Sequence, residues 1–236
     1  MIGSDFDGTS LIMLAARVLT FLLVIPIHES AHGLVAKWLG DDTAYKQGRI
    51  SLSPFVHIDL YGLLMMIVLG FGWAKPVPVD PSGFKHRRAG YALVSLAGPV
   101  SNILAAIVAL LIYAGIACTE PGLEAIYDGF SSSHSLLSGI QILLTYLFQV
   151  NVGLAVFNMI PLPPLDGFNI LRAFMPARFD NWVFMHQRAI STVFMLLLIG
   201  MTFIPRAYSP LYVAIDFVYD LLWKVVMWIP VVRWGG

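Results

Sequence analysis

The chain of 236 residues is 58% hydrophobic and only 12% charged. Because a soluble globular domain has about 25% charged residues, this composition excludes an ordinary soluble domain and predicts an integral membrane protein. Its 14 basic and 14 acidic residues give a formal net charge of zero, which argues against a nucleic-acid-binding protein. The single cysteine, Cys118, excludes an internal disulfide and a CxxC metal site.

The first predicted element is a long apolar stretch over residues 11–39 that contains the ionisable residues His28, Glu29 and His32. A charged side chain at bilayer depth costs at least about 2.5 to 3.5 kcal/mol, so such residues indicate a functional site. In this H-E-x-x-H pattern the histidines are about one helical turn apart, and both imidazoles can bind one zinc ion. Glu29 is then placed to take a proton from a water that the zinc activates. On a soluble helix the pattern would often be a solvated face, but inside an apolar span the groups would be left unpaired without a metal or partners.

The next region, residues 48–81, is predicted to be a re-entrant or β-hairpin-like segment. GRISLSP at 48–54 alternates like a short strand, and the apolar stretch at 61–73 is shorter than the roughly 20 residues of a spanning helix. The prolines of FGWAKPVPVDP at 71–81 favour an extended chain. Irregular backbone at membrane depth must be satisfied by protein or by water, so a cavity is implied. Basic residues on both sides predict that both ends of the segment are cytoplasmic. They are Lys37, Lys46 and Arg49 before it, and Lys75, Lys85, Arg87 and Arg88 after it.

Two further spans are predicted over residues 89–117 and 135–160, and the loop between them, 118–134, has acidic but no basic residues and is expected outside. After the third span, Asp166 follows three helix-breaking prolines, and Gly167 permits a turn that aims the carboxylate back into the bundle. Taken alone, this Pro-Leu-Asp-Gly sequence would be a surface turn. The topology, however, places Asp166 at the cytoplasmic end of the third span, at the depth of the two histidines, and makes it the candidate third zinc ligand.

The C-terminal part contains apolar stretches at 189–204 and 211–229, which predict one or two further helices. Asp216, Asp220 and Lys224 recur at four-residue spacing on one face of the second stretch. That stretch therefore either spans the membrane against the bundle or lies at the interface.

Together these elements predict an all-α polytopic membrane protein with three spans, a re-entrant or β-hairpin-like segment, and one or two C-terminal helices. We expect a single membrane-embedded domain over residues 1–236. Its catalytic core is expected over residues 11–172 and its C-terminal helices over residues 189–229.

Three motifs in this order resemble the site-2 protease family of intramembrane zinc metalloproteases. They are HESAH, SLAGPVSN and NMIPLPPLDG, at residues 28–32, 95–102 and 158–167. The resemblance implies a core of three transmembrane helices and one zinc ion per chain, held by His28, His32 and Asp166. It also implies that Glu29 is the general base and that the substrate is a transmembrane helix of another protein. FGWAKPVPV resembles the compact prokaryotic branch of the family. We therefore expect neither a PDZ domain between the first two core spans nor a soluble C-terminal sensing domain.

Several polar or small residues near these motifs admit two interpretations. The resemblance suggests that Asn158, and less strongly Asn102, contacts the substrate backbone or an oxyanion. A hydrogen bond between helices, worth about 0.6 to 2 kcal/mol, is a sufficient structural reason for either residue. His57 is expected to be a satisfied polar residue, with an accessory ligand as the alternative. Gly98 and Pro99 are expected to allow close helix packing and a kink that faces the metal site.

The resemblance implies regulated intramembrane proteolysis, in which zinc-dependent hydrolysis cuts a single-span substrate protein in or near its transmembrane helix. That helix must unwind before its carbonyl can be reached, and an edge formed by GRISLSP or FGWAKPVPV could pair with the unwound stretch. We expect a multi-pass protein of a prokaryotic cell membrane, in contact with lipid, with its active site nearer the cytoplasmic side. One alternative is a membrane metal transporter, which would not require a glutamate beside two ligating histidines and a remote Asp-Gly turn. The other is a catalytically silent membrane scaffold.

Overall fold

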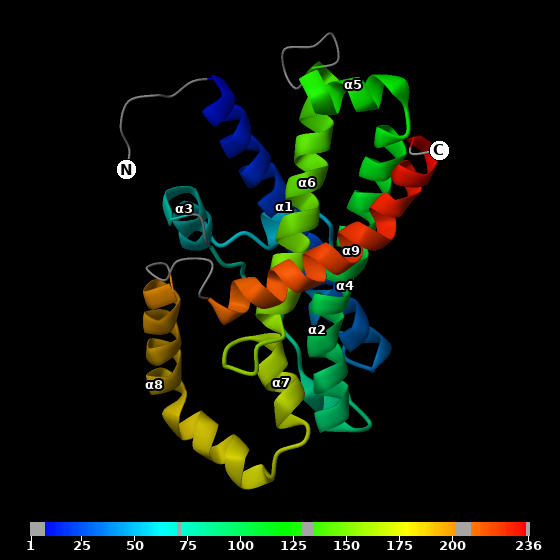
Figure 1. Ribbon diagram of the computed structural model, residues 1–236. Coiled ribbons are helices and arrows are strands. Elements are labelled where there is room, and N and C mark those ends of the chain that lie inside the picture. Colours follow the sequence, from blue (N-terminus) through cyan, green and yellow to red (C-terminus); the bar gives the residue numbers. More distant parts are fainter. Residues whose placement is uncertain (1–7, 70–71, 129–134, 202–208, 235–236) are drawn as a thin grey trace.

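The structure consists of helices joined by irregular segments, and the part of the chain that it describes contains no strand (Figure 1). It is a computed structural model, and it describes residues 8–69, 72–128, 135–201 and 209–234. Three of the described helices are long and apolar enough to cross a membrane: α1 (Gly8–Trp38), α4 (Arg87–Ala117) and α6 (Ser135–Asn158). The other elements are α2 (Thr43–Lys46), η1 (Pro54–Val56), α3 (Leu60–Leu69), η2 (Pro81–Gly83), α5 (Glu120–Asp128), α7 (Asp166–Arg172), α8 (Ala177–Met201) and α9 (Pro210–Trp234). The predicted all-α polytopic fold class is confirmed.

Helix α4 is the centre of the bundle, because it packs against both α1 and α6. Its buried face is built largely from small residues, among them Gly98, Ala106, Ala109 and Ala114. Small side chains let helices approach closely, which matters in lipid because apolar burial alone does not drive helices together there. Bulky side chains of α6 complete this core, chiefly Leu144, Phe148 and Val152.

The re-entrant segment differs in detail from its prediction. The strand predicted over residues 48–54 is not formed, and the pairing found among the described residues of this segment is an isolated antiparallel bridge between Ile58 and Ala74. Between these two residues lies α3, whose ten residues extend about 15 Å at 1.5 Å per residue, too short to cross a bilayer. The two arms run close together, since a β-carbon added at Gly62 would collide with the Trp73 backbone. The hairpin-like course is therefore present, although the ladder that defines a strand is not.

Helix α8 begins earlier than its apolar stretch suggested. The prediction placed a helix over 189–204, whereas the observed helix extends from Ala177 to Met201, and residues 202–204 lie outside the described part of the chain. The first half of α8 is polar, so a search for apolar runs does not detect it. This half carries Arg178, Asp180, Asn181, His186 and Arg188.

Helix α9 crosses the bundle obliquely in front of α4 and α6 (Figure 1). It packs through an aromatic face: the ring centroids of Tyr219 and Phe148 lie 4.7 Å apart, and Trp223 stacks on Tyr219. The charged residues Asp216, Asp220 and Lys224 are exposed. Neither α8 nor α9 is among the described helices that are apolar enough to span a membrane.

Candidate metal centre

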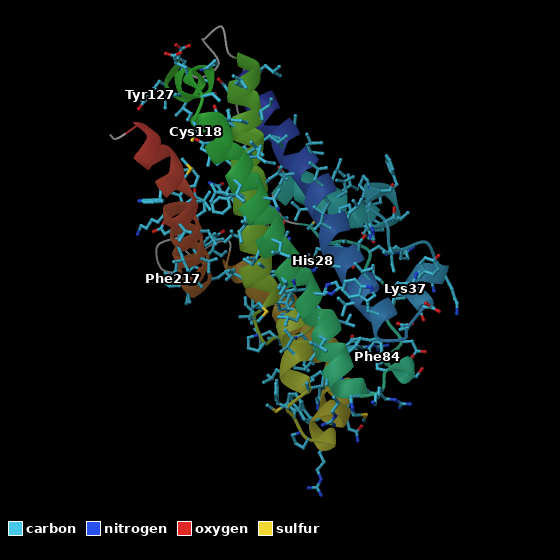
Figure 2. The ribbon with its side chains drawn as sticks, turned by 90° about the vertical axis from the view of Figure 1, so that its right-hand side faces the viewer. His28, Lys37, Phe84, Cys118, Tyr127 and Phe217 are labelled. Carbon is cyan, nitrogen blue, oxygen red and sulfur yellow. The ribbon has the colours of Figure 1, made fainter. Side chains whose placement is uncertain are left out.

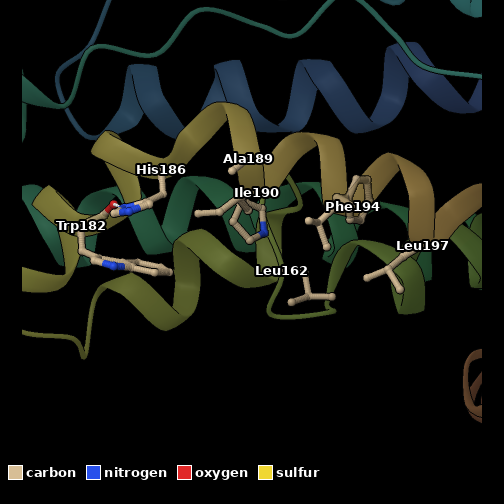
Figure 3. A pocket seen from close by; sticks show the side chains of 9 residues that line it. Leu162, Trp182, His186, Ala189, Ile190, Phe194 and Leu197 are labelled. Carbon is tan, nitrogen blue, oxygen red and sulfur yellow. Dashed lines mark hydrogen bonds between the residues drawn. The ribbon is translucent and has the colours of Figure 1, made fainter.

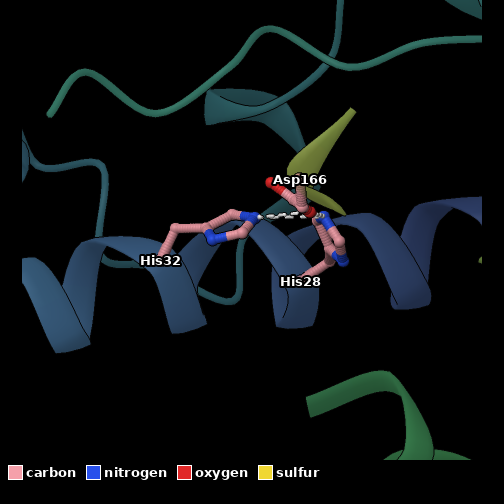
Figure 4. Close-up of side chains that lie close together, drawn as sticks. All are labelled: His28, His32 and Asp166. Carbon is pink, nitrogen blue, oxygen red and sulfur yellow. Dashed lines mark hydrogen bonds and ion pairs between the residues drawn. The ribbon is translucent and has the colours of Figure 1, made fainter. Parts of the chain in front are cut away.

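His28 and His32 come together because they are one turn apart on α1, inside the first apolar span. Both side chains are buried, and their Nε2 atoms lie 3.1 Å apart. The Oδ2 atom of Asp166 lies 3.3 Å from Nε2 of His28 and 3.5 Å from Nε2 of His32 (Figure 4). Figure 2 shows His28 between the end of the bundle marked by Cys118 and the end marked by Phe84.

Asp166 is delivered by the loop and short helix that follow α6. It is the first residue of α7, which is anchored by the buried side chains of Leu165 and Phe168. Gly167 is required here, but not for a turn with positive φ, which the structure does not give it. A β-carbon at this position would collide with the backbone of Met159 and Ile160, so only glycine lets α7 pass this close to the end of α6.

The hydrogen bonds of the imidazoles decide what the cluster can bind. His28 Nδ1 lies 2.5 Å from Oδ1 of Asn102, and His32 Nδ1 lies 2.7 Å from the carbonyl oxygen of Val94. Both partners are acceptors, so each Nδ1 carries a proton, and each Nε2 is the ring nitrogen that faces Asp166 and can bind a cation. Asp166 Oδ2 is itself buried, and among the described residues it lies within ion-pair distance of both Nε2 atoms but accepts no conventional hydrogen bond. These three groups could hold one metal ion, and two imidazoles with one carboxylate match the ligand set of a catalytic zinc site.

The charge of Asp166 suits this role. Burial alone would raise the pKa of the Asp166 carboxyl, but the adjacent His28 and His32 outweigh that effect and lower the pKa to about 2. The carboxylate is therefore ionised at neutral pH, as a zinc ligand must be.

The orientation of Asn102 is fixed by a chain of amides between α4 and α6. Asn151 donates through Nδ2 to the Leu147 carbonyl, at 2.8 Å, which leaves its Oδ1 as an acceptor. Asn102 donates to that oxygen at 2.9 Å, so its own Oδ1 must face His28. Asn102 is fully buried and both ends of its amide are occupied, which favours a role in orienting His28 over contact with a substrate. Asn151 was not singled out in the sequence; the signal was an amide inside an apolar span.

Gly98 makes room for both imidazoles. It lies one turn before Asn102 on α4, and a β-carbon there would approach the His28 Cε1 atom and the His32 ring to 2.5 Å. The close packing expected of Gly98 is present, against the two imidazoles of the candidate metal site.

Glu29 lies between the two histidines in sequence and is half-buried. Its Oε2 accepts a hydrogen bond of 2.9 Å from the backbone N–H of Val77, in the extended segment after α3. The spacing of H-E-x-x-H gave no indication of this contact, because the two residues are 48 positions apart.

The other predicted site residues lie outside the cluster. Asn158, at the end of α6, is half-buried and donates to the Leu154 carbonyl of its own helix at 3.1 Å. His57 is fully buried and its Nε2 lies 2.9 Å from the Ser51 carbonyl, but among the described residues its Nδ1 has no hydrogen-bond partner, so the expected satisfied polar residue is found for one ring nitrogen only. It is not part of the ligand cluster found among the described residues.

An apolar groove of about 260 Å³ lies beside the loop that leads to Asp166. One side of it is formed by Leu162 and Pro163, and the other by α8 (Figure 3). The residues contributed by α8 are Trp182, His186, Ala189, Ile190, Val193, Phe194 and Leu197.

Comparison with known proteins gives one family and two relatives. Residues 16–201 match the model of "Peptidase family M50". The chain is 40% identical over 159 residues to "Putative zinc metalloprotease YwhC" of Bacillus subtilis (strain 168), covering 67% of this chain and 68% of that protein. It is 26% identical over 179 residues to "Putative zinc metalloprotease Rip2" of Mycolicibacterium smegmatis (strain ATCC 700084 / mc(2)155), covering 70% of this chain and 62% of that protein. No solved structure matches the chain significantly.

Proposed function

The chain belongs to peptidase family M50, the site-2 protease family, and is an intramembrane zinc metalloprotease; we propose that His28, His32 and Asp166 hold its zinc ion. The observation that supports this assignment is the convergence of two imidazole Nε2 atoms on a buried carboxylate oxygen, with both Nδ1 protons directed elsewhere. This assignment leaves no basis for preferring a metal transporter or a silent scaffold.

Glu29 is proposed as the general base. Zinc bound at the site supplies Lewis-acid polarisation of the scissile carbonyl and lowers the pKa of the attacking water. The Glu29 carboxylate accepts a proton from that water while the water oxygen attacks the carbonyl carbon. When the carbon–nitrogen bond breaks, Glu29 returns the proton to the leaving amine. Asn102 and the Val94 carbonyl hold the two imidazoles in position throughout.

The proposed substrates are single-span membrane proteins. A transmembrane helix satisfies all its backbone groups internally, so its carbonyls are accessible only where it unwinds. Asn158 remains our candidate for a contact to the unwound backbone, because its side chain is bonded only within its own helix and lies just before the loop to Asp166. The Asn102 amide, in contrast, is proposed to act through His28.

The active site is proposed to lie nearer the cytoplasmic side of a prokaryotic cell membrane. The end of α1 and the start of α4 lie at one end of the bundle, and α5 lies at the other (Figure 1). The first end is basic and the α5 end is acidic, which is the charge bias expected for cytoplasmic and external loops. Both relatives named above are bacterial, which supports a prokaryotic membrane.

The test is a co-expression assay in which wild type, Glu29→Gln and Asp166→Ala are compared on candidate single-span substrates. Glu29→Gln should lower cleavage about 10² to 10⁴ fold, because it removes the base, and should keep the zinc content of wild type. Asp166→Ala should lose both zinc and activity, because two histidines alone bind the ion weakly. Zinc content is measured by atomic absorption on purified protein. Loss of zinc from Glu29→Gln, or full zinc in Asp166→Ala, would contradict the assignment.

A further inference from the structure

An extended segment beside α1, residues 74–80, has few backbone N–H donors at its centre. Its sequence is Ala-Lys-Pro-Val-Pro-Val-Asp, and we call it the strap. Pro76 and Pro78 have no N–H and also hold their preceding residues extended. Of the three central residues 76–78, only Val77 therefore has an amide N–H to donate. That N–H donates to Oε2 of Glu29 at 2.9 Å.

This contact fixes one oxygen of the carboxylate and leaves the other open. In the part of the chain that the structure describes, Glu29 Oε1 makes no hydrogen bond. The side chain of Val77 is buried, and its Cγ1 lies 3.4 Å from the position that a β-carbon of Gly33 would occupy, one helical turn beyond Glu29. The strap thus packs directly on the turn of α1 that carries the base.

Arg49 holds the strap in this position. Its guanidinium is buried, and Nη2 donates to the carbonyls of Lys75 at 2.6 Å and Pro76 at 3.1 Å, immediately before Val77. The strap is also held at both ends: Lys75 N–H donates to the His57 carbonyl at 2.8 Å, and Asp80 N–H donates to Asp41 Oδ2 at 2.7 Å. Nothing in the described residues places a carboxylate within ion-pair distance of Arg49.

Burying a cation without a counter-charge costs free energy, so stability alone is a poor reason for an arginine at this position. We propose that Arg49 is a positioning residue, which acts through the Lys75 and Pro76 carbonyls to hold the Val77 amide against Glu29. The inference rests on the proposed function of Glu29 as the base. Since the Val77 amide is occupied by Glu29, the strap offers no donor for a substrate strand at this residue.

Positioning and substrate pairing make different kinetic predictions. A misplaced base slows the chemical step, and a displacement of about 1 Å can cost about a hundredfold in rate. Removal of a uniform substrate contact instead raises KM and leaves kcat unchanged. The ratio of the two effects therefore distinguishes a strap that orients Glu29 from a strap that binds the substrate.

The decisive variant is Val77→Pro, which removes the amide hydrogen and keeps a compact apolar side chain in a segment already extended by its neighbours. Its matched control is Val79→Pro in the same strap, because the Val79 amide makes no hydrogen bond in the described part of the chain. Full-length protein in detergent is assayed on a single-span substrate that wild type cleaves. We expect Val77→Pro to lower kcat about ten- to a hundredfold with KM within about twofold of wild type, at unchanged zinc content and melting temperature. Val79→Pro should stay within about twofold of wild type in both constants.

Substitution of Arg49 provides the second arm. Arg49→Met should reproduce the loss of kcat, and Arg49→Lys should restore part of it, because an ammonium can still donate to the two carbonyls. Zinc content is measured for each variant.

A rise of KM at constant kcat, equal effects of Val77→Pro and Val79→Pro, or loss of zinc from Val77→Pro would each overturn the inference. Glu29→Gln is assayed in parallel: if it still cleaves, the proposed base is wrong. If Glu29→Gln is inactive and Val77→Pro behaves like wild type, only the inference about Arg49 and the strap is wrong.

Discussion

At the scale of single residues, the site depends as much on the partners of the ligands as on the ligands. Each histidine uses its Nδ1 hydrogen bond to turn its Nε2 inward, and the two acceptors come from α4. The acceptor for His28 is a side chain, Asn102, and that for His32 is a backbone oxygen. Only the first of these can be removed by mutation, which makes Asn102 the informative position.

We predict that Asn102→Ala weakens zinc binding about ten- to a hundredfold, because the His28 imidazole loses the group that orients it. Chelator competition on purified protein measures this affinity. Ser101→Ala is the control, since Ser101 is the adjacent residue and its hydroxyl, among the described residues, donates to the Gly98 carbonyl of its own helix and not to an imidazole. Unchanged zinc affinity together with a higher KM would instead support the contact to substrate that the family resemblance suggested.

A second residue-scale prediction concerns Gly98. In a helix, alanine is normally about 0.8 to 1 kcal/mol more favourable than glycine, but the added methyl group at position 98 would strike both imidazoles. We expect Gly98→Ala to lose most of its zinc and its activity. Gly115→Ala in the same helix should keep both, because nothing lies within 4 Å of the added carbon there. Equal zinc contents in the two variants would show that the site can yield to a methyl group.

At the scale of elements, α7 places Asp166, the proposed third ligand. The helix has only seven residues, too few to be stable alone in water, so its position depends on its packing. Leu165 and Phe168 anchor it, and Gly167 allows its close contact with the end of α6. Asp166 is thus aimed by contacts of its neighbours and not by a turn of its own.

We therefore predict that Gly167→Ala moves Asp166 away from the histidines and lowers zinc occupancy, while the protein still folds. Gly153→Ala, in α6, is the control because the added carbon meets no atom within 4 Å. Zinc content and melting temperature are measured for both variants. Wild-type zinc in Gly167→Ala would mean that the loop before α7 absorbs the collision.

At the scale of the whole molecule, the depth of the site follows from the arrangement of the three spans. The chain must place α1, α4 and α7 so that groups from all three meet at one level, which only a fixed bundle can do. Helix α9 braces this bundle through its aromatic contacts with α6. Sidedness is the property on which access of water and release of products depend.

We predict that the α5 end faces outward and the start of α4 faces the cytoplasm, from the bias of basic residues. Single cysteines at Tyr127 and Arg87, both exposed, are introduced in a Cys118→Ser background. A membrane-impermeant thiol reagent on intact cells should label position 127 and not position 87. The reverse pattern would invert the protein and place the zinc site nearer the external face.

The three spans were predictable from the sequence, and so were the residues that we propose as zinc ligands, the histidine pair on α1 and Asp166. Length and apolarity are local properties, and a four-residue spacing on a helix defines a common face whatever surrounds it. The same local logic was wrong about a strand at 48–54, because alternation does not supply the partner that a ladder needs, and it missed the polar half of α8. The orientation of the proposed ligands and the contact that holds Glu29 depend on how the helices pack. Those contacts join residues 74, 62 and 48 positions apart, and no local pattern encodes which backbone or side-chain oxygen will lie opposite a given nitrogen after the helices pack.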